Sequence, residues 1–416
     1  MNRRTFLLGT LAAMTLPAFA AGAQTQQDEA DGLRLVLATD LHYIAPTLTD
    51  NGPYFTRMVE NADGKVMTHI EPLTEAFVSE MIRLKPDALI LSGDLTFNGA
   101  KESHEALAVH LSRIREAGVP VYVLPGNHDL NMRVSARFEG EGYALVESVT
   151  ADEFAAIYRD FGFDAALARD PHSLSYAAAL TPSLRLLMVD VNTAAAPGRL
   201  TQETLGFFRD QLEEARAAGA RVIAVSHQNL LQHNPLYADG FVIENASPLA
   251  RLYEEYGVLL QLSGHMHLHH TASAGAGLTE IAVSALSVSP NQYGLLTVKD
   301  RSLAFHTVRT DVESWAQRTG VSDPDLLRFE AFSNAFFRLS TVRQAQALFG
   351  DDERGKALSD YLSEVNACYF SGRMDLAPID KALLEAWMAQ GAFFSLYLRS
   401  IFSEPLIDHT QYETAW

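Results

Sequence analysis

Five short clusters along the 416-residue chain carry side chains that bind metal ions. They combine aspartate, asparagine and histidine, and they read Asp40-Leu41-His42, Gly93-Asp94, Gly126-Asn127-His128-Asp129, Ser226-His227 and Gly264-His265-Met266-His267. Carboxylate oxygens and imidazole nitrogens suit manganese, iron or zinc. A set of this size can hold two ions, and two neighbouring ions commonly catalyse the hydrolysis of phosphate esters.

Each cluster follows a short apolar run that predicts a buried strand. These runs are residues 33–39, 88–91, 119–124, 222–225 and 258–262. Open α/β sheets carry their active sites at the carboxyl ends of such strands. The sequence therefore predicts that the clusters converge at one rim of a sheet.

The segments between these runs predict helices. The first is indicated by apolar residues on one helix face, Leu73, Phe77, Met81 and Leu84, and the next covers residues 101–117. This βαβαβ order favours a mainly parallel sheet. Further helices are expected at 202–217 and 249–256, and further strands at 174–179, 184–190, 278–284, 293–299 and 302–308. We expect an α/β fold in which two packed β-sheets are flanked by helices, an αββα sandwich.

Two insertions follow metal-type clusters and are expected at the metal rim. In residues 43–70, the turn Asp63-Gly64 predicts a hairpin between 59–61 and 65–68. This insertion either covers the metal site or is a surface loop. The second insertion, residues 130–172, contains a predicted helix at 152–159. Both are candidates for the walls of a substrate pocket.

The sequence changes character at about residue 312. Asp323-Pro324 is typical of a helix start, and apolar residues then repeat at helical spacing, as in Leu358, Tyr361, Leu362, Val365 and Tyr369. We therefore expect an all-α C-terminal extension over residues 312–416, after a catalytic domain over residues 33–311.

Composition narrows the range of partners. Hydrophobic residues make up 48% of the chain, and the formal net charge is −19. Such an acidic surface disfavours nucleic acid polymers and anionic membranes as partners. Cys368 is the one cysteine, so neither an internal disulfide nor a cysteine-rich metal site can form. The sequence leaves the oligomeric state open.

The N-terminus resembles an export signal. Arg3-Arg4 precedes an apolar stretch, and small residues offer cleavage sites after Ala20 or Ala23. The alternative is an uncleaved membrane anchor, but the run is only marginally long enough and contains Pro17. We expect residues 1–23 to be a signal peptide of the twin-arginine type, a periplasmic or secreted location, and no membrane span in the mature chain.

The ordered clusters resemble the signature of the calcineurin-like metallophosphoesterases over about residues 33–310. Any one cluster alone is a weak signal, whereas the full set in order is a strong one. The resemblance implies two metal sites that share Asp94 as a bridge. One would take Asp40, His42 and His267, and the other Asn127, His227 and His265. It also implies that His128 contacts the phosphate and assists the leaving oxygen, while Asp129 orients His128.

Other polar residues are weaker candidates. Asn98 either contacts substrate or belongs to the turn that begins a helix. His233 follows the single metal histidine by six residues and is a candidate for substrate contact. His269 and His270 are not expected to face the cleft.

The predicted function is that of an exported two-metal phosphoesterase acting on a small phosphoester. Among family members, the sequence resembles cyclic-nucleotide and glycerophosphodiester phosphodiesterases. A phosphomonoesterase or nucleotidase is the alternative, because the metals act on the phosphate and not on the leaving group. A third possibility is a metal-loaded binding protein that recognises phosphorylated molecules without hydrolysing them.

Overall fold

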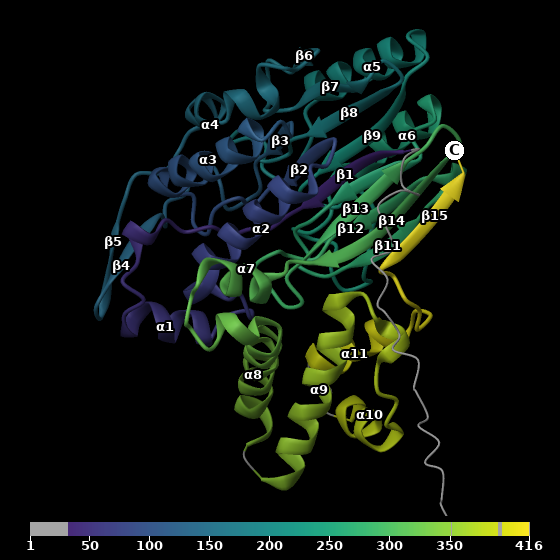
Figure 1. The fold of residues 1–416 in the computed structure, drawn as a ribbon. Helices are drawn as coiled ribbons and strands as arrows, with labels where there is room; N and C mark the ends of the chain where they lie inside the picture. The colour runs from purple at the N-terminus through teal and green to yellow at the C-terminus, as the bar shows by residue number, and fades with distance from the viewer. Residues whose placement is uncertain (1–31, 351, 390–392, 416) are drawn as a thin grey trace, which may run out of the picture. The chain divides into compact units, whose positions relative to one another are not determined.

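Two β-sheets form the centre of the fold in a computed structural model that describes residues 32–350, 352–389 and 393–415 (Figure 1). The first has the order β15-β14-β13-β1-β2-β3, with β1 Leu33–Ala38, β2 Ala88–Ser92, β3 Val121–Leu124, β13 Gln292–Val298, β14 Ser302–Arg309 and β15 Gln411–Ala415. The second has the order β11-β12-β10-β9-β8-β7-β6, with β6 Ala168–Arg169, β7 Tyr176–Thr181, β8 Leu184–Val189, β9 Arg221–Ser226, β10 Leu260–Ser263, β11 His270–Ser273 and β12 Thr279–Ala282.

Parallel strands form one half of the first sheet, up to its edge strand β3, and the centre of the second sheet. β1, β2 and β3 run parallel, with Val36 opposite Leu89, whereas β13 pairs antiparallel with β1. In the second sheet, β8, β9, β10 and β12 run parallel, and β7 and β11 are antiparallel to their neighbours. The predicted βαβαβ unit is parallel, but both sheets are mixed rather than mainly parallel. The shared direction of the parallel strands brings their carboxyl ends to one rim.

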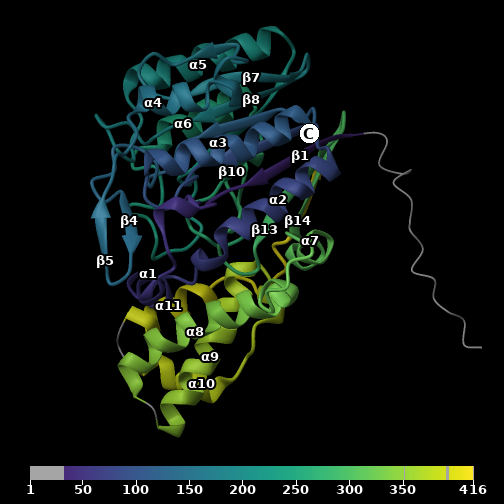
Figure 2. The same cartoon turned by 60° about the vertical axis from the view of Figure 1, so that its left-hand side comes forward.

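Helices cover the outer faces of both sheets (Figures 1 and 2). On the first sheet these are α2 Ile70–Leu84, α3 Lys101–Glu116 and α7 Val312–Thr319, and on the second they are α5 Gln202–Ala217 and α6 Ala246–Tyr256. Alternate residues of β8 point to opposite faces of the second sheet. Leu186 and Met188 pack in the core that includes the first sheet, while Leu187 packs with α5 and α6. Because both faces are buried, the strands read as continuous apolar runs. The predicted sandwich is confirmed.

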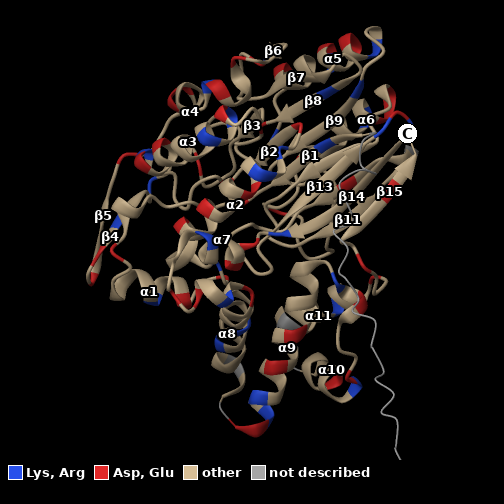
Figure 3. Cartoon of the chain, viewed as in Figure 1, with Lys and Arg blue, Asp and Glu red and all other residues tan. Residues whose placement is uncertain are grey.

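The remaining elements are short or belong to the insertions and the C-terminal region. They are the hairpin β4 Ala136–Glu139 and β5 Gly142–Leu145, the helices α1 Pro53–Glu60 and α4 Ala151–Ile157, the 3₁₀ turns η1 Pro46–Leu48, η2 Met67–His69, η4 Gly275–Gly277, η5 Leu326–Arg328 and η6 Met374–Leu376, and the π-helical turn η3 Arg159–Phe163. Figure 3 shows that charged residues gather on helices and loops, while the strands are largely uncharged.

One predicted element of the first insertion is wrong. Residues 59–68 form no hairpin. Val59 belongs to helix α1, and residues 67–69 form the turn η2. Pro53 stands at the first position of α1, and Phe55 and Val59 bury one face of this helix four residues apart. The helical spacing of the apolar residues therefore decides the structure before residue 61. The Asp63-Gly64 turn follows α1 but does not join two strands.

The C-terminal region is helical, as predicted, except at its end. Its main helices are α8 Phe329–Phe349, α9 Glu353–Ser371, α10 Lys381–Met388 and α11 Phe393–Phe402. The last described residues instead form β15, which pairs with β14 and places Phe305 opposite Tyr412 (Figure 1). The prediction of an all-α extension missed this strand, because a five-residue edge strand carries little local signal.

The helices of the C-terminal region share an apolar core with the loop between β10 and β11. Met266 and Leu268 lie in the same apolar core as residues of α9, α10 and α11. From Leu33 onward the described chain forms one compact unit. The predicted signal peptide, residues 1–23, lies outside the described residues.

Candidate metal centre

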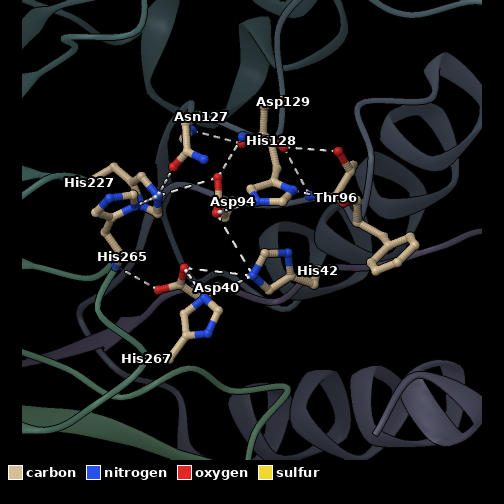
Figure 4. Close-up of polar contacts among 12 residues, drawn as sticks. Asp40, His42, Asp94, Thr96, Asn127, His128, Asp129, His227, His265 and His267 are labelled. Atoms are coloured by element: carbon tan, nitrogen blue, oxygen red, sulfur yellow. Dashed lines mark hydrogen bonds and ion pairs between the residues drawn. The ribbon is translucent and has the colours of Figure 1, made fainter. Parts of the chain in front are cut away.

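The predicted ligands meet where the parallel strands end (Figure 4). Asp40 and Asp94 follow the last residues of β1 and β2 by two positions, and His227 directly follows β9. Backbone hydrogen bonds tie neighbouring strand ends together, from Asp40 N to Gly93 O at 3.1 Å and from Gly264 N to His227 O at 3.1 Å. The expected convergence at one rim is present.

Two groups of side chains could each hold one ion, and they share Asp94. Their ligand atoms lie within 4.8 Å of one another, in the sets Asp40, His42, Asp94, His267 and Asp94, His227, His265. Asn127 Oδ1 lies 3.1 Å from His227 Nε2, which adds an amide oxygen to the second set. The structure therefore brings together all seven residues that the sequence analysis assigned to two metals, in the same division.

Asp94 faces both groups at once. Its Oδ1 lies 3.3 Å from His227 Nε2, and its Oδ2 lies 3.8 Å from His42 Nε2. A carboxylate with one oxygen toward each group can bridge two cations. No other carboxylate belongs to both groups among the residues that the structure describes.

Backbone carbonyls orient the histidines of the second group. His227 Nδ1 lies 2.9 Å from Ser92 O, and His265 Nε2 lies 2.8 Å from Gly240 O. When each of these nitrogens donates to its carbonyl, the other nitrogen of each ring keeps its lone pair. These free nitrogens, His227 Nε2 and His265 Nδ1, lie 3.2 Å apart and face the site.

The ligand loops are held in a strained backbone conformation. Five ligands have a φ in the left-handed region: Asp40 (52°), His42 (47°), Asp94 (46°), His265 (69°) and His267 (59°). This conformation is uncommon outside glycine, and it clusters at functional sites that the surrounding structure holds in place. The sharp turns that it makes aim successive side chains at one point.

Gly126 allows the loop after β3 to approach Asp94. A Cβ at position 126 would overlap both the backbone nitrogen and the carboxylate of Asp94. Glycine is therefore required here for space. The close approach lets His128 N donate a 2.8 Å hydrogen bond to Asp94 Oδ1.

Charge in the site is balanced between carboxylates and imidazoles. Burial alone would raise the pKa of Asp94, but the nearby imidazoles, above all His227, hold it well below its usual range. Burial works to lower the pKa of His227, yet Asp94 and Asp40 raise it to about 9. Without a cation, a proton on His227 thus balances the carboxylates, and the same position favours a bound metal ion.

The side chains fit two metal ions chemically. Asp40 Oδ1 is buried and has no hydrogen-bond donor, and it points into the first group with His267 Nε2 at 3.3 Å. A buried carboxylate oxygen of this kind requires a cation or a proton. The donors are oxygen and nitrogen atoms without thiolate, which suits the harder transition metals.

His128 lies beside the two groups, but Asp129 does not orient it. His128 Nε2 is 3.9 Å from Asp94 Oδ2, and Nδ1 lies 3.0 Å from Phe97 O, so a backbone carbonyl orients the ring. The carboxylate of Asp129 is fully buried and accepts hydrogen bonds from Gly126 N, Leu95 N and the backbone and side chain of Thr96. The expected role of Asp129 is therefore corrected: it holds the strand-end loops together.

The two candidate substrate residues lie away from the cleft. Asn98 is buried, and its side-chain amide donates to Ala136 O at 3.2 Å. His233 is fully buried, with His270 Nδ1 at 3.0 Å and Glu280 Oε2 at 3.4 Å. Substrate contact is therefore not supported for either residue. His270 is buried as well, in line with the expectation that it does not face the cleft.

A cleft of about 390 Å³ opens at the metal centre. Metal-group residues and His128 form its base, and its walls are Asp63, Lys65, Tyr237, Phe241, Met266, Leu268, Tyr369, Phe370 and Tyr397. The first insertion contributes to this wall, which agrees with the first of its two alternatives and not with a surface loop. The second, residues 130–172, contributes none of the lining residues, so its predicted role is wrong.

Sequence reasoning missed the aromatic wall and Lys65. The aromatic residues come from the loop between β9 and α6, from α9 and from α11, and no local pattern shows that these elements face the metals. One signal was available: in His265-Met266-His267-Leu268, the histidines alternate with apolar residues. The histidines turn to the metal groups, while Met266 and Leu268 enter the core of the C-terminal helices.

Comparison with known proteins agrees with this geometry. The calcineurin-like phosphoesterase family model matches residues 33–269, and a model of the C-terminal domain of cyclic nucleotide phosphodiesterase matches residues 311–408. A protein of Ruthia magnifica named a probable cyclic nucleotide phosphodiesterase is 24% identical over 210 residues, which are 50% of this chain and 73% of that protein.

Two further proteins illustrate the range of similarity. The glycerophosphodiester phosphodiesterase GpdQ of Enterobacter lignolyticus is 27% identical over 193 residues, which are 45% of this chain and 58% of that protein. The structure of a dimetal phosphatase from Danio rerio superposes with a TM-score of 0.49 at 13% identity, and covers 67% of this chain and 98% of that one.

The fold and the paired metal groups define a metal-dependent hydrolase of phosphate esters. More specifically, the chain belongs to the calcineurin-like phosphoesterase family, whose model matches more than half of it. Among residues 32–350, 352–389 and 393–415, no helix combines the length and apolar character needed to cross a membrane.

Proposed function

We propose that this protein is a phosphodiesterase whose two metal sites share Asp94, and that its substrates are small diesters such as cyclic nucleotides or glycerophosphodiesters. The observation that carries the proposal is the cleft, in which the shared metal centre faces an aromatic wall. The names of the two relatives above support the diester class.

The metals would be held by Asp40, His42, His267 and Asp94 on one side, and by Asn127, His227, His265 and Asp94 on the other. When bound, two such ions supply Lewis acidity and lower the pKa of water. We propose manganese, iron or zinc, in keeping with the oxygen and nitrogen donors. His128 stands at the edge of the centre, where its Nε2 can hold a proton for the leaving oxygen.

The aromatic wall favours a diester over a monoester. A monoester carries about two negative charges near pH 7 and a diester one, so two cations alone favour the monoester. A diester needs compensating contacts for its second ester arm. Tyr237, Phe241 and Tyr369 border the centre and offer flat apolar surface to such an arm.

Hydrolysis assays test this proposal directly. The purified protein with added Mn²⁺ should hydrolyse bis(p-nitrophenyl) phosphate with a higher kcat/KM than p-nitrophenyl phosphate. Parallel assays with 2′,3′-cyclic AMP, 3′,5′-cyclic AMP and glycerophosphodiesters would identify the natural class. A higher kcat/KM for p-nitrophenyl phosphate would favour a phosphomonoesterase or nucleotidase instead. Absence of hydrolysis in every assay would favour a metal-dependent binding protein.

We also propose that the protein is exported to the periplasm or secreted by a twin-arginine signal. Arg3-Arg4 and the apolar stretch that follows support this proposal. Replacement of both arginines by lysine should retain the protein in the cytoplasm, whereas the unaltered chain should be recovered outside it and shortened near residue 23. Unchanged localisation of the double variant would contradict a twin-arginine route.

A further inference from the structure

Lys65 is a buried cation beside the metal centre. Its side chain is 9% exposed, and it lines the same cleft as Asp94, Asn127 and His128. Among the described residues that line this cleft, it is the one lysine, and no arginine accompanies it. No motif in the sequence marks it, because it lies in the insertion between the first and second clusters.

A short chain of contacts connects Lys65 to the first metal group. Its Nζ donates to Asp63 Oδ2. The same oxygen of Asp63 lies 3.6 Å from His267 Nδ1, and His267 Nε2 lies 3.3 Å from Asp40 Oδ1. Lys65 Nζ is therefore separated from a metal-facing imidazole by a single carboxylate oxygen. Asp63 stands where the carboxylate partner of a metal-binding histidine is usually found.

The backbone fixes Lys65 to the loop that carries Asp40. Lys65 pairs with Val288 in an antiparallel bridge, and Val66 N donates to Ser287 O at 2.9 Å. Ser287 Oγ in turn donates to Asp40 O at 2.8 Å. The position of Lys65 relative to the centre is thus set by backbone hydrogen bonds and not only by its own flexible side chain.

Helix α8 of the C-terminal region holds the loop before Lys65. Ser340 Oγ and Gln344 Nε2 both donate to Ala62 O, and Arg343 donates to Glu60 O at 2.8 Å. Gly64 lies against Phe337 of the same helix: a Cβ there would come within 2.7 Å of the ring, at a φ of +86°. The loop therefore fits α8 closely and presents its next residue to the cleft.

Lys65 has hydrogen-bonding capacity to spare. An ammonium group has three N–H donors, and the hydrogen bond to Asp63 uses one of them. Buried donors that remain unused call for further hydrogen-bond acceptors, and a phosphoryl oxygen in the cleft is such an acceptor. Resting on the phosphodiesterase function proposed above, we propose that Lys65 is a substrate-binding residue that donates to a nonbridging oxygen of the phosphoryl group, and that α8 holds it in position for this contact.

This contact gives α8 a role in the reaction. Two bound metal ions would supply positive charge to the phosphoryl group, and Lys65 would add a third positive centre on the wall formed by the insertion. The transition state spreads negative charge over the phosphoryl oxygens, so a fixed cation there contributes to rate as well as to binding. Asp63 acts as a positioning residue, since it contacts both Lys65 and His267.

Replacement of Lys65 by methionine tests the contact in the full-length mature protein loaded with Mn²⁺. A charge-assisted hydrogen bond is typically worth about 10- to 100-fold in binding. We expect Lys65→Met to lower kcat/KM for bis(p-nitrophenyl) phosphate by about this factor. The affinity for inorganic phosphate, measured by calorimetry, should fall by a similar factor. Metal content and Tm should remain those of the wild type, and Lys65→Arg should restore part of the loss.

Lys101→Met is the matched control, because Lys101 pairs with Glu147 and Glu153 outside the cleft. It should leave kcat/KM and phosphate binding unchanged. If Lys65→Met does not fold, Lys65→Gln provides a neutral donor of similar shape. Phosphate binding and kcat/KM within twofold of the wild type in Lys65→Met would overturn the proposal, as would loss of bound metal, which would make Lys65 structural. Because phosphate binding needs no turnover, this test remains decisive even if the diesterase assignment fails.

A second variant tests the role of α8. Ser340→Ala combined with Gln344→Ala removes both donors to Ala62 O, and it should weaken phosphate binding in the same direction as Lys65→Met, with metal content retained. Arg354→Ala on the exposed face of α9 is the control. Unchanged phosphate binding in the double variant would overturn the part assigned to α8.

Discussion

The backbone N–H of His128 donates a 2.8 Å hydrogen bond to Oδ1 of Asp94. This oxygen also faces His227, while the other oxygen of the same carboxylate faces His42. The loop that carries His128 is therefore fixed to the one side chain that both metal groups share. The two metal groups and the proposed proton donor are coupled through Asp94.

Asp94→Asn should remove both metals together. An amide keeps the shape and can still accept from His128 N, but it offers only one weak ligand oxygen in place of a bridging carboxylate. We expect the metal content to fall well below two ions per chain and kcat/KM to fall by about 10³-fold or more, since metal catalysis contributes several kcal/mol. Elemental analysis and diester hydrolysis measure these effects. Retention of both metals would contradict the bridging assignment, and Asp190→Asn, another buried carboxylate at a strand end, is the control.

His128→Ala should leave the metals bound and reduce turnover. Its ring faces the cleft with a 36% exposed side chain, and it belongs to neither metal group although it lies near Asp94 and edge-to-face against His42. General acid catalysis typically contributes about 10²- to 10⁴-fold, so kcat should fall within this range on unactivated diesters. The loss should be smaller for nitrophenolate leaving groups, which need no proton. An equal loss on both substrate types would argue against proton donation, and His172→Ala at an exposed site is the control.

The ligand set could be predicted because each ligand follows a strand whose two faces are both buried. Continuous apolar runs such as residues 88–91 identify these strands, and the polar residue that ends each run marks the rim. The grouping around Asp94 was assigned from the family resemblance, and the structure reproduces it. Long-range order along the chain thus carries enough information to define this centre.

The walls of the cleft could not be predicted in the same way. Tyr369 in α9 and Tyr397 in α11 each stand at the helical spacing of the core residues of their own helix. Nothing local separates a core position from a cleft position. The prediction that Asp129 orients His128 was wrong because backbone N–H groups of neighbouring loops donate hydrogen bonds to the Asp129 carboxylate. The prediction of substrate contact for His233 was wrong because Glu280 and His270, both distant in sequence, surround this side chain in the interior.

Phe241→Ala should weaken the binding of aromatic diesters. The ring lies 5.3 Å from His265 and 4.9 Å from Tyr237 between centroids, at the mouth of the metal centre. An aromatic contact is worth about 0.5–1.5 kcal/mol, which corresponds to a rise in KM of about 2- to 10-fold for bis(p-nitrophenyl) phosphate. The KM for glycerophosphodiesters, whose arms are not aromatic, should change less. A uniform change across these substrates would show that the ring only supports the loop, and Phe207→Ala on α5 is the control.

Asp190 should make the protein less stable as pH rises. Burial raises the pKa of its carboxyl to about 6, against 3.8 in an unperturbed chain, despite hydrogen bonds from Asn192 N and Leu174 N. The folded state therefore keeps a proton that the unfolded state loses, and folding is favoured below about pH 4. This advantage is lost between about pH 4 and pH 6, because ionisation of the buried group then costs free energy.

Asp190→Asn removes this titration. The free energy of unfolding of the wild type, relative to that of the variant, should fall by on the order of 3 kcal/mol between pH 4 and pH 7, at about 1.4 kcal/mol per pKa unit. Any constant effect of the amide cancels in this slope. Urea denaturation of metal-free protein at several pH values measures it, with Asp210→Asn on the exposed face of α5 as the baseline. A difference that stays level with pH, or one that rises, would show that the folded carboxyl is ionised throughout.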